Sequence, residues 1–399
     1  MIAGAGHAAG QVVASLKRKN FDGDIVLVGE ESYLPYQRPP LSKKFLAGEM
    51  AAERLFFKPE SFYDEPNIDV RLNTRITAID RSAKTLAADN GDSIRYDTLI
   101  LALGSHARRV PVEGDELEGV HYLRSIRDVN RIRQGLESAR RLVIVGAGYI
   151  GLEVAAVTRQ LGFEVTVIEM ADRVMSRVVS PEVSAFYQGE HLARGVDLQL
   201  STGLCTLLGD RRVTAVETTN DRTIDTDLVI IGVGIQANTG LAEAAGLSIK
   251  NGIVVDERCR TSDPDIYAVG DCTSHPNSVY GRHLRLESVH NALEQAKTAA
   301  ANASGEDMRY SQVPWFWSDQ YDLHLQIAGV SDGYDEIVMR GSQGDRSFAC
   351  AYLQEGRLIA IDAINAPRDF VQAKPLIADA VMPDREMLAD AGTMLKDLG

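Results

Sequence analysis

Two glycine-rich loops, each placed between an apolar strand and an apolar helix, constrain the fold of this chain more than any other feature. The first lies in "IAGAGHAAGQVVASLKRKNFDGDIVLVGE" at positions 2–30, and the second in "LVIVGAGYIGLEVAAVTRQLGFEVTVIE" at positions 142–169. Such a loop directs free helix N–H groups at a pyrophosphate and marks a dinucleotide-binding βαβ unit. The repetition predicts an α/β protein with two Rossmann-like dinucleotide-binding domains.

The second loop carries the complete fingerprint. Gly146, Gly148 and Gly151 have the spacing G-x-G-x-x-G directly after a strand. The first glycine allows the tight turn, the second lets a pyrophosphate approach the backbone, and the third lets helix and strand pack closely. Glu169 ends the next strand, where a carboxylate accepts hydrogen bonds from ribose hydroxyls and repels a 2'-phosphate. This loop is therefore expected to bind NADH rather than NADPH.

The first loop has Gly4, Gly6 and Ala9, and Glu30 ends its second strand. Alanine in the third place is an accepted variant of the fingerprint. Only three residues precede Gly4, so the first strand is a stub. Two copies of NAD would have no chemistry to do together, and the economical pair of ligands is FAD and NADH, with hydride passing from nicotinamide to flavin.

Further apolar runs have the continuous pattern of parallel strands that are covered on both faces. They occupy positions 24–30, 98–104, 141–146, 164–169, 228–234 and 265–271. The pattern changes near position 312, after which runs joined by Gly and Asp turns predict antiparallel strands, followed by a charged helical tail. We expect a third, α+β domain there.

Composition narrows the classes of function. A chain of 399 residues is longer than a single hydrophobic core usually supports, so we expect two or three domains. The formal charge of −14 argues against a nucleic-acid partner. No apolar run approaches the roughly 20 residues that span a bilayer, and the first residues lack the basic flank and cleavage site of a signal peptide. The expected location is cytoplasmic.

The four cysteines include no C-x-x-C pair. This excludes the usual zinc spacing and the dithiol of disulfide reductases, so we expect no metal site and four buried, reduced thiols.

Several segments occur in the order found in one family: "GAGHAAG", "LPYQRPPLSK", "LILALG", "GAGYIGLEVA", "NGIVVDE", "IYAVGDC", "ESVHNALEQA" and "PWFWSDQY". The chain resembles the FAD-dependent NADH:ferredoxin reductases of bacterial haem monooxygenases and aromatic-ring dioxygenases over nearly its full length. The resemblance implies a glutathione-reductase-like flavoprotein fold. It divides the chain into an FAD-binding domain of residues 1–110 and 237–313, an NADH-binding domain of 111–236 and a C-terminal domain of 314–399.

The resemblance also implies an FAD site. Glu30 would bind the FAD ribose, Lys43 would lie near flavin N5, and Asp271 would take a ribityl hydroxyl. Val289 begins a helix whose N-terminus would face the flavin pyrimidine edge, where it would stabilise the negative charge of the reduced ring. The other implied FAD contacts are Gly4, Gly6, Ala8, Ala9, Arg38, Ile76, Ala102, Arg124 and Trp317.

For NADH, the resemblance implies contacts from Gly146, Gly148, Ile150, Gly151, Glu153, Glu169, Arg177 and Gly232. Glu153 would direct its carboxylate at the nicotinamide amide and pair with Lys43, although no periodicity joins these two positions. From pattern alone, Trp315 and Trp317 are expected in the core. The resemblance moves Trp317 to the flavin face and makes Lys43, Glu153 and Trp317 the candidate catalytic residues.

The implied partner is a [2Fe-2S] ferredoxin that serves a terminal oxygenase, and the implied state is a monomer. Because such ferredoxins are acidic, docking requires a local basic patch, for which we take residues 281–288 with Arg282 and Arg285 as a hypothesis. An NADH oxidase of this architecture usually has an active cysteine near position 43, and none is present. A non-enzymatic FAD- and NADH-binding protein, similar to apoptosis-inducing factor, stays open.

Overall fold

The computed structural model describes residues 1–399, and none of its helices is both long and apolar enough to cross a membrane. The chain folds into two compact units. Unit 1 comprises Met1–Arg38, Ala52–His106 and Gln236–Trp315, and unit 2 comprises Pro39–Ala51, Ala107–Ile235 and Phe316–Gly399. The three-domain division stays a prediction.

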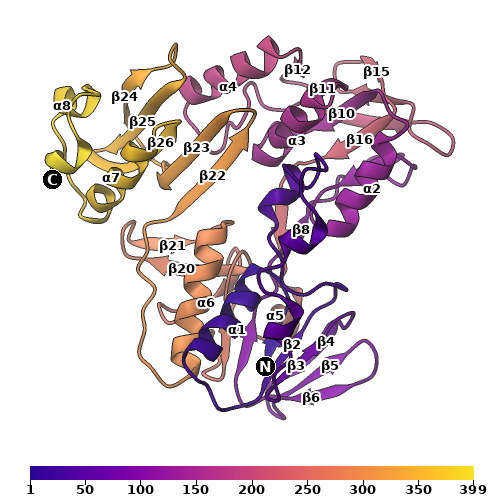
Figure 1. The fold of residues 1–399 in the computed structure, drawn as a ribbon, viewed down its shortest axis with the longest axis vertical. Helices are drawn as coiled ribbons and strands as arrows, with labels where there is room; N and C mark the ends of the chain where they lie inside the picture. The colour runs from indigo at the N-terminus through magenta and orange to yellow at the C-terminus, as the bar shows by residue number, and fades with distance from the viewer. The chain divides into compact units, whose positions relative to one another are not determined.

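Unit 1 is built on a five-stranded parallel sheet (Figure 1). The strand order is β19 (Ile266–Ala268), β7 (Leu99–Leu101), β1 (Ile2–Ala3), β2 (Ile25–Val28) and β3 (Ile68–Arg71). The two-residue stub β1 is central, because Ile2 pairs with Leu27 on one side and Ile100 on the other. Helices α1 (His7–Arg18) and α6 (Val289–Ala303) pack together, and their small alanines share one core with this sheet.

Smaller elements complete unit 1. They are an antiparallel sheet of β4 (Ile76–Asp80), β5 (Thr85–Ala88) and β6 (Ser93–Arg95), a sheet of β18 (Ile253–Val254), β20 (Thr273–Asn277) and β21 (Arg282–Leu284), helix α5 (Gly240–Ala244), and the 3-10 turns η2 (Ala52–Leu55) and η3 (Glu60–Phe62). Strands β8 (Ser105–Ala107) and β17 (Ile235–Ala237) lie where the chain passes from one unit to the other.

Unit 2 contains a second parallel sheet, with the order β12 (Asp197–Gln199), β11 (Glu164–Ile168), β10 (Arg141–Val145), β16 (Leu228–Ile231) and β9 (Val120–Tyr122). All four residues of β16 are buried, which confirms that a continuous apolar run marks a strand covered on both faces. The remaining elements of this part are α2 (Ile126–Leu136), α3 (Tyr149–Gln160), α4 (Pro181–Ala193), and an antiparallel sheet of β13 (Leu204–Leu208), β14 (Ala215–Thr218) and β15 (Thr223–Asp225).

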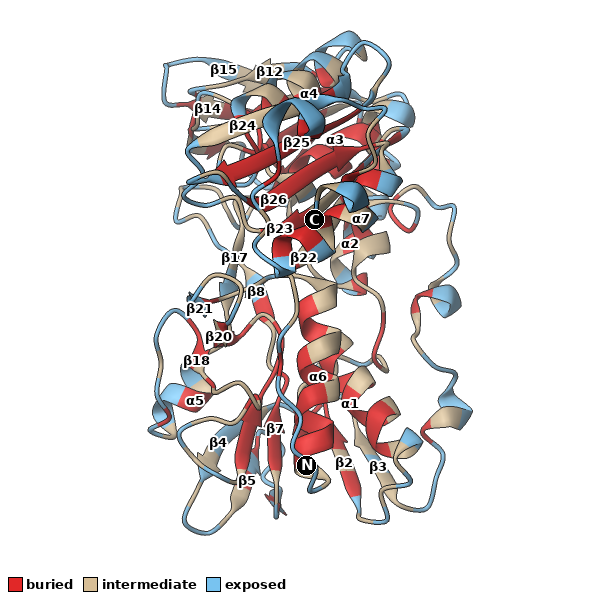
Figure 2. Ribbon diagram, turned by 90° about the vertical axis from the view of Figure 1, so that its left-hand side faces the viewer, coloured by how far each residue is buried: buried red, intermediate tan, exposed pale blue.

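The C-terminal part of unit 2 is an antiparallel sheet with a helical tail, as predicted. Its strands run in the order β22 (Trp315–Gln320), β23 (Leu323–Gly329), β26 (Arg357–Ile364), β25 (Ser347–Gln354) and β24 (Glu336–Ser342). The central strands β25 and β26 are buried along most of their length, whereas β22 is an edge strand (Figure 2). The tail consists of α7 (Pro367–Ala378), α8 (Arg385–Ala389) and the 3-10 turn η4 (Leu395–Leu398).

Residues 39–51 leave unit 1 and join unit 2. Their 3-10 turn η1 (Pro39–Ser42) contacts α2 and α3, and the Arg133 guanidinium of α2 lies 5.9 Å from the centre of the Phe45 ring. The sequence division placed these residues in the FAD-binding domain. Their position in unit 2 brings Lys43 to helix α3.

Candidate functional site

The first glycine loop is shaped by two different requirements. Gly4 has a φ of +107°, and a Cβ there would lie 2.2 Å from the carbonyl oxygen of Ala102. At Gly6, the residue before α1, a Cβ would meet nothing within 4 Å. The packing of the protein therefore requires glycine at position 4, whereas the space beside Gly6 is open to a ligand.

The second loop repeats this arrangement. Gly146 has a φ of +102°, and a Cβ there would lie 2.6 Å from the carbonyl oxygen of Gly232. A Cβ at Gly151 would lie 2.0 Å from the carbonyl oxygen of Gly146, so the third glycine allows α3 to pack against its own loop. At Gly148, a Cβ would again meet nothing within 4 Å. Both loops thus leave room at the middle glycine, where a pyrophosphate must approach the backbone.

The two glycine-loop helices lack the side-chain caps of α2, α4 and α6, and unlike the uncapped helices α5 and α7 they have no acidic residue in the first turn. Helices α2, α4 and α6 are preceded by the N-cap residues Ser125, Ser180 and Ser288, and each serine side chain accepts a backbone N–H of the first turn. Helices α1 and α3 have no side-chain cap and no acidic residue in the first turn. Their free N–H groups and helix dipoles favour a bound anion.

Both predicted ribose carboxylates lie at the ends of their strands. Glu169 accepts the backbone N–H of Ala147 at 2.7 Å and that of Ala171 at 2.9 Å, so its carboxylate lies against the second glycine loop. Glu30 pairs with Arg75 at 3.0 Å, and 61% of its side chain is exposed. Glu169 is therefore held by the backbone, whereas Glu30 is held by one surface ion pair.

Two further FAD candidates of unit 1 have polar partners. The hydroxyl of Ser105 donates to Asp271 at 2.7 Å. Arg38 pairs with Glu31 at 2.7 Å and donates to the Tyr36 hydroxyl at 3.0 Å. Burial lowers the pKa of Arg38, but Tyr36, Glu31 and Asp271 together raise it above its usual value. Arg38 and Asp271 therefore interact electrostatically.

The remaining FAD candidates are distributed over both units. In unit 1, Ala8 and Ala9 are buried in the first turn of α1, Ile76 begins β4, Ala102 follows β7 and Val289 begins α6. The start of α6 at Val289 agrees with the sequence prediction. Lys43, Arg124 and Trp317 belong to unit 2, where the backbone N–H of Arg124 donates to Asp128 at 3.1 Å.

Lys43 and Glu153 form an ion pair within unit 2. Lys43 Nζ lies 2.8 Å from Glu153 Oε2, and only 4% of the Glu153 side chain is exposed. The Ser42 hydroxyl donates to the same oxygen at 2.5 Å, and the Ser318 hydroxyl donates to Glu153 Oε1 at 2.7 Å. A buried carboxylate is thus surrounded by three donors, as its charge requires.

The two serines were missed by sequence reasoning. Ser42 precedes Lys43 in "PPLSK", and Ser318 follows Trp317 in "PWFWSDQY", so each lies in a segment that was already singled out. Alternation along β22 was the available signal, because Phe316, Ser318 and Gln320 share one face of a strand.

The geometry agrees with comparisons to known proteins. The sequence model of the pyridine nucleotide-disulphide oxidoreductase family matches residues 1–296, and that of the reductase C-terminal domain matches residues 315–399. The chain belongs to this family. Membership implies a flavin and a pyridine nucleotide.

Several curated relatives are ferredoxin reductases of oxygenase systems. The ferredoxin reductase subunit of 5,5'-dehydrodivanillate O-demethylase from Sphingobium sp. (strain NBRC 103272 / SYK-6) is 43% identical, with 100% of this chain and 97% of the relative covered. Putidaredoxin reductase CamA of Pseudomonas putida is 41% identical, with 100% and 96% covered. The reductase in a crystal structure of the covalent putidaredoxin reductase–putidaredoxin complex superposes with a TM-score of 0.96 at 41% identity, and the match covers 100% of this chain and 97% of that chain. The predicted family and fold class are confirmed.

Within this pyridine nucleotide-disulphide oxidoreductase, the nicotinamide-side candidates lie around the second loop. Ile150 follows the open Gly148 by two positions and is 37% exposed, which is high for a large apolar side chain. Gly232 follows β16 and faces Gly146 through its carbonyl group, and Arg177 is exposed. Their role in NADH binding stays a prediction.

The tryptophans of this reductase differ from the core expectation. Trp315 and Trp317 are both half-buried, because β22 is an edge strand of the C-terminal sheet. The centre of the Trp317 ring lies 6.3 Å from that of the Phe316 ring. The centre of the Phe316 ring lies 4.8 Å from that of Tyr149, the first residue of α3. The core prediction from pattern alone was wrong, and the role of Trp317 at the flavin face stays a prediction.

The cysteines supply no disulphide chemistry. All four are free, and Cys259, Cys272 and Cys350 are buried. Burial raises the pKa of the Cys272 thiol to about 11 and that of Cys350 to about 12, so these thiols stay protonated at neutral pH. The prediction of four buried thiols was wrong for Cys205, which is exposed on the small antiparallel sheet.

Proposed function

We propose that this protein transfers electrons from NADH through FAD to a [2Fe-2S] ferredoxin that serves a bacterial haem monooxygenase or ring dioxygenase. The observation that supports this most strongly is the pair of uncapped helices with open middle glycines, together with the buried Lys43–Glu153 pair. Two dinucleotide sites without active cysteines fit an electron-transfer reductase better than a disulfide reductase.

The residues of the first loop fit FAD. The open position beside Gly6 and the free N–H groups of α1 suit its pyrophosphate, while Glu30 and Asp271 would accept hydrogen bonds from hydroxyls of the ribose and the ribityl chain. Bound FAD would supply two-electron uptake from NADH and one-electron delivery to the ferredoxin. The N-terminus of α6 would stabilise negative charge on the reduced ring.

The second loop would bind NADH. The open position beside Gly148 suits the NADH pyrophosphate, and Glu169 lies against that loop. Because a carboxylate repels a 2'-phosphate, Glu169 favours NADH over NADPH.

Glu153 would orient the nicotinamide. A carboxylate offers about four acceptor positions, and Lys43, Ser42 and Ser318 occupy three of them. The remaining position on Oε1 can accept an N–H of the nicotinamide amide. Lys43 meanwhile compensates the buried charge and holds the carboxylate in one orientation.

A coupled assay separates this function from its alternatives. With NADH, a [2Fe-2S] ferredoxin and cytochrome c, we expect cytochrome c reduction that depends on the ferredoxin. An NADH oxidase would instead consume oxygen at the same rate with and without ferredoxin, and a non-enzymatic binding protein would reduce cytochrome c negligibly. Either result would overturn the proposal.

A further inference from the structure

A chain of hydrogen bonds leads from Glu153 to the surface of unit 2. Ser318, whose hydroxyl donates to Glu153, accepts from Gln320 Nε2 at 3.3 Å. Gln320 Oε1 lies 2.9 Å from His191 Nε2, and His191 Nδ1 lies 3.2 Å from the Tyr321 hydroxyl. The proposed function uses Glu153 and Ser318 but leaves Gln320 and His191 unexplained.

The donors and acceptors of this hydrogen-bond chain have one order. Gln320 Nε2 also faces the sulfur of Met175 at 3.9 Å, and a thioether can only accept, which supports this orientation of the amide. Gln320 Oε1 must then accept from His191, so His191 carries its proton on Nε2 and accepts from Tyr321 on Nδ1. Every donor in the chain therefore points toward the Glu153 carboxylate.

Burial fixes this arrangement. His191, Ser318 and Gln320 are all at most 1% exposed, so each polar atom depends on its neighbour in the chain. Burial lowers the pKa of His191 to about 4, which keeps the imidazole neutral at physiological pH. A single arrangement of protons thus persists from Tyr321 to Glu153.

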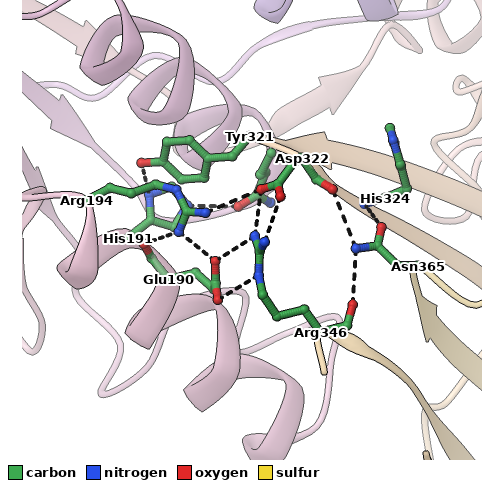
Figure 3. A network of polar contacts seen from close by, with 9 residues as sticks. Glu190, His191, Arg194, Tyr321, Asp322, His324, Arg346 and Asn365 are labelled. Carbon is green, nitrogen blue, oxygen red and sulfur yellow. Dashed lines mark hydrogen bonds and ion pairs between the residues drawn. The ribbon is translucent and has the colours of Figure 1, made fainter. Parts of the chain in front are cut away.

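The Tyr321 end of the hydrogen-bond chain is held by a network of charged side chains (Figure 3). The Arg194 guanidinium lies 4.3 Å from the centre of the Tyr321 ring, and Arg194 pairs with Glu190 at 2.6 Å. Arg346 pairs with Glu190 at 3.0 Å and with Asp322 at 2.6 Å. The network joins α4 to two turns of the C-terminal sheet, so both sides of the hydrogen-bond chain are fixed in place.

We propose that Gln320, supported by His191, is a positioning residue for Glu153. Because Gln320 donates to the Ser318 oxygen, the Ser318 hydroxyl keeps donating its hydrogen bond to Glu153 Oε1. The last acceptor position of Oε1 therefore always points in the same direction. The inference rests on the proposed function, in which that position receives the nicotinamide amide.

A double-mutant cycle tests the coupling. Gln320→Met preserves length and removes both polar ends, and Ser318→Ala removes the link to Glu153. In FAD-loaded protein, each substitution should slow NADH-dependent bleaching of the flavin about five-fold, the effect of losing roughly one hydrogen bond. The double variant should be no slower than the slower single variant, because both act through the same contact. Multiplying losses, or an unchanged rate in Gln320→Met, would overturn the proposal.

The protons of His191 give a readout that does not depend on turnover. In the ¹⁵N NMR spectrum of histidine-labelled protein, His191 should show the neutral Nε2–H form from pH 5.5 to 8. Gln320→Glu keeps an acceptor for His191 but has no donor for Ser318, so it should raise the pKa of His191 into this range and slow bleaching as Gln320→Met does. A wild-type His191 that titrates near its usual pKa, or carries its proton on Nδ1, would refute the chain.

A matched control is Gln354→Met. Gln354 ends β25 on the surface and donates to the carbonyl oxygen of Gly333, so its loss should leave the bleaching rate unchanged. If wild-type protein failed to bleach with NADH, the proposed function would fail instead. The NMR result would still decide whether the hydrogen-bond chain exists.

Discussion

At the residue scale, the glycines show the difference between what the fold needs and what a ligand needs. Their spacing was readable from the sequence, but only the structure separates Gly148, which is open, from Gly151, which lies against a carbonyl oxygen. A Cβ added at Gly148 therefore tests ligand binding, and a Cβ added at Gly151 tests the stability of the fold.

We expect Gly148→Ala to fold normally and to raise the KM for NADH about tenfold, because its methyl group occupies the space beside the loop backbone where a pyrophosphate must approach. Gly151→Ala should instead lower the free energy of unfolding by about 1–3 kcal/mol, because its Cβ would lie 2.0 Å from an oxygen. Urea unfolding and steady-state kinetics measure the two effects. Equal loss of stability in both variants would contradict this assignment.

Asp362 makes stability depend on pH. It is fully buried beside Tyr352, whose hydroxyl donates to it at 2.5 Å, and burial raises the pKa of Asp362 to about 7. Folding then takes up a proton between pH 4 and 7, so the free energy of unfolding falls as pH rises through this range, by about 1.4 kcal/mol per unit at most. Asp362→Asn should flatten this slope in urea unfolding at pH 5, 6 and 7. An unchanged slope would show that Asp362 does not titrate there.

At the element scale, one buried arginine holds the C-terminal tail. Arg340 of β24 is 1% exposed, pairs with Asp369 of α7 at 3.0 Å and donates to the carbonyl oxygens of Leu388, Asp390, Ala391 and Thr393. Because these carbonyls follow or end α8, the arginine joins the sheet, α7 and the tail.

Arg340→Ala should lower the free energy of unfolding by about 3–5 kcal/mol, since it leaves the buried Asp369 carboxylate without its ion-pair partner and the buried Leu388 carbonyl without its donor. It should also expose residues 385–399 to limited proteolysis. Arg385→Ala, which removes an exposed pair with Glu336, is the matched control and should change neither property measurably. A tail that stays protease-resistant in Arg340→Ala would show that other contacts hold it.

Secondary structure was largely predictable, because each element follows from local pattern. All six predicted parallel strands are present, and the antiparallel C-terminal sheet begins where the pattern changes. The contacts of Glu153 were not predictable from pattern. They join η1, α3 and β22, which meet only through tertiary packing, and no periodicity relates Ser42 to Ser318. The resemblance supplied the pairing of Glu153 with Lys43, and neither source supplied Gln320 or His191.

At the scale of the whole molecule, the charge of −14 restricts how the proposed ferredoxin can dock, because the resemblance implies that this partner is acidic too. Arg282 of β21 is exposed, and Arg285 pairs with Glu287 at 2.5 Å and donates to Asn251 at 3.2 Å. The docking hypothesis uses the positive charges of both arginines.

Charge reversal at Arg282 and Arg285 should raise the KM for ferredoxin several-fold and leave NADH-dependent ferricyanide reduction intact, because ferricyanide needs no docking patch. Arg95→Glu, an exposed arginine on β6 of the same unit, should leave both activities unchanged. If both activities fell together in the double reversal, the patch would lie elsewhere.

The central claim is that one glycine loop retains FAD while the other presents NADH to it. Anaerobic titration of the purified, FAD-reconstituted protein with NADH, followed in the visible spectrum, tests this most directly. We predict that the flavin bands bleach with an end point at one equivalent of NADH, and that NADPH bleaches them much more slowly. A folded protein that takes up no FAD, or whose flavin bands persist in excess NADH, would contradict the account.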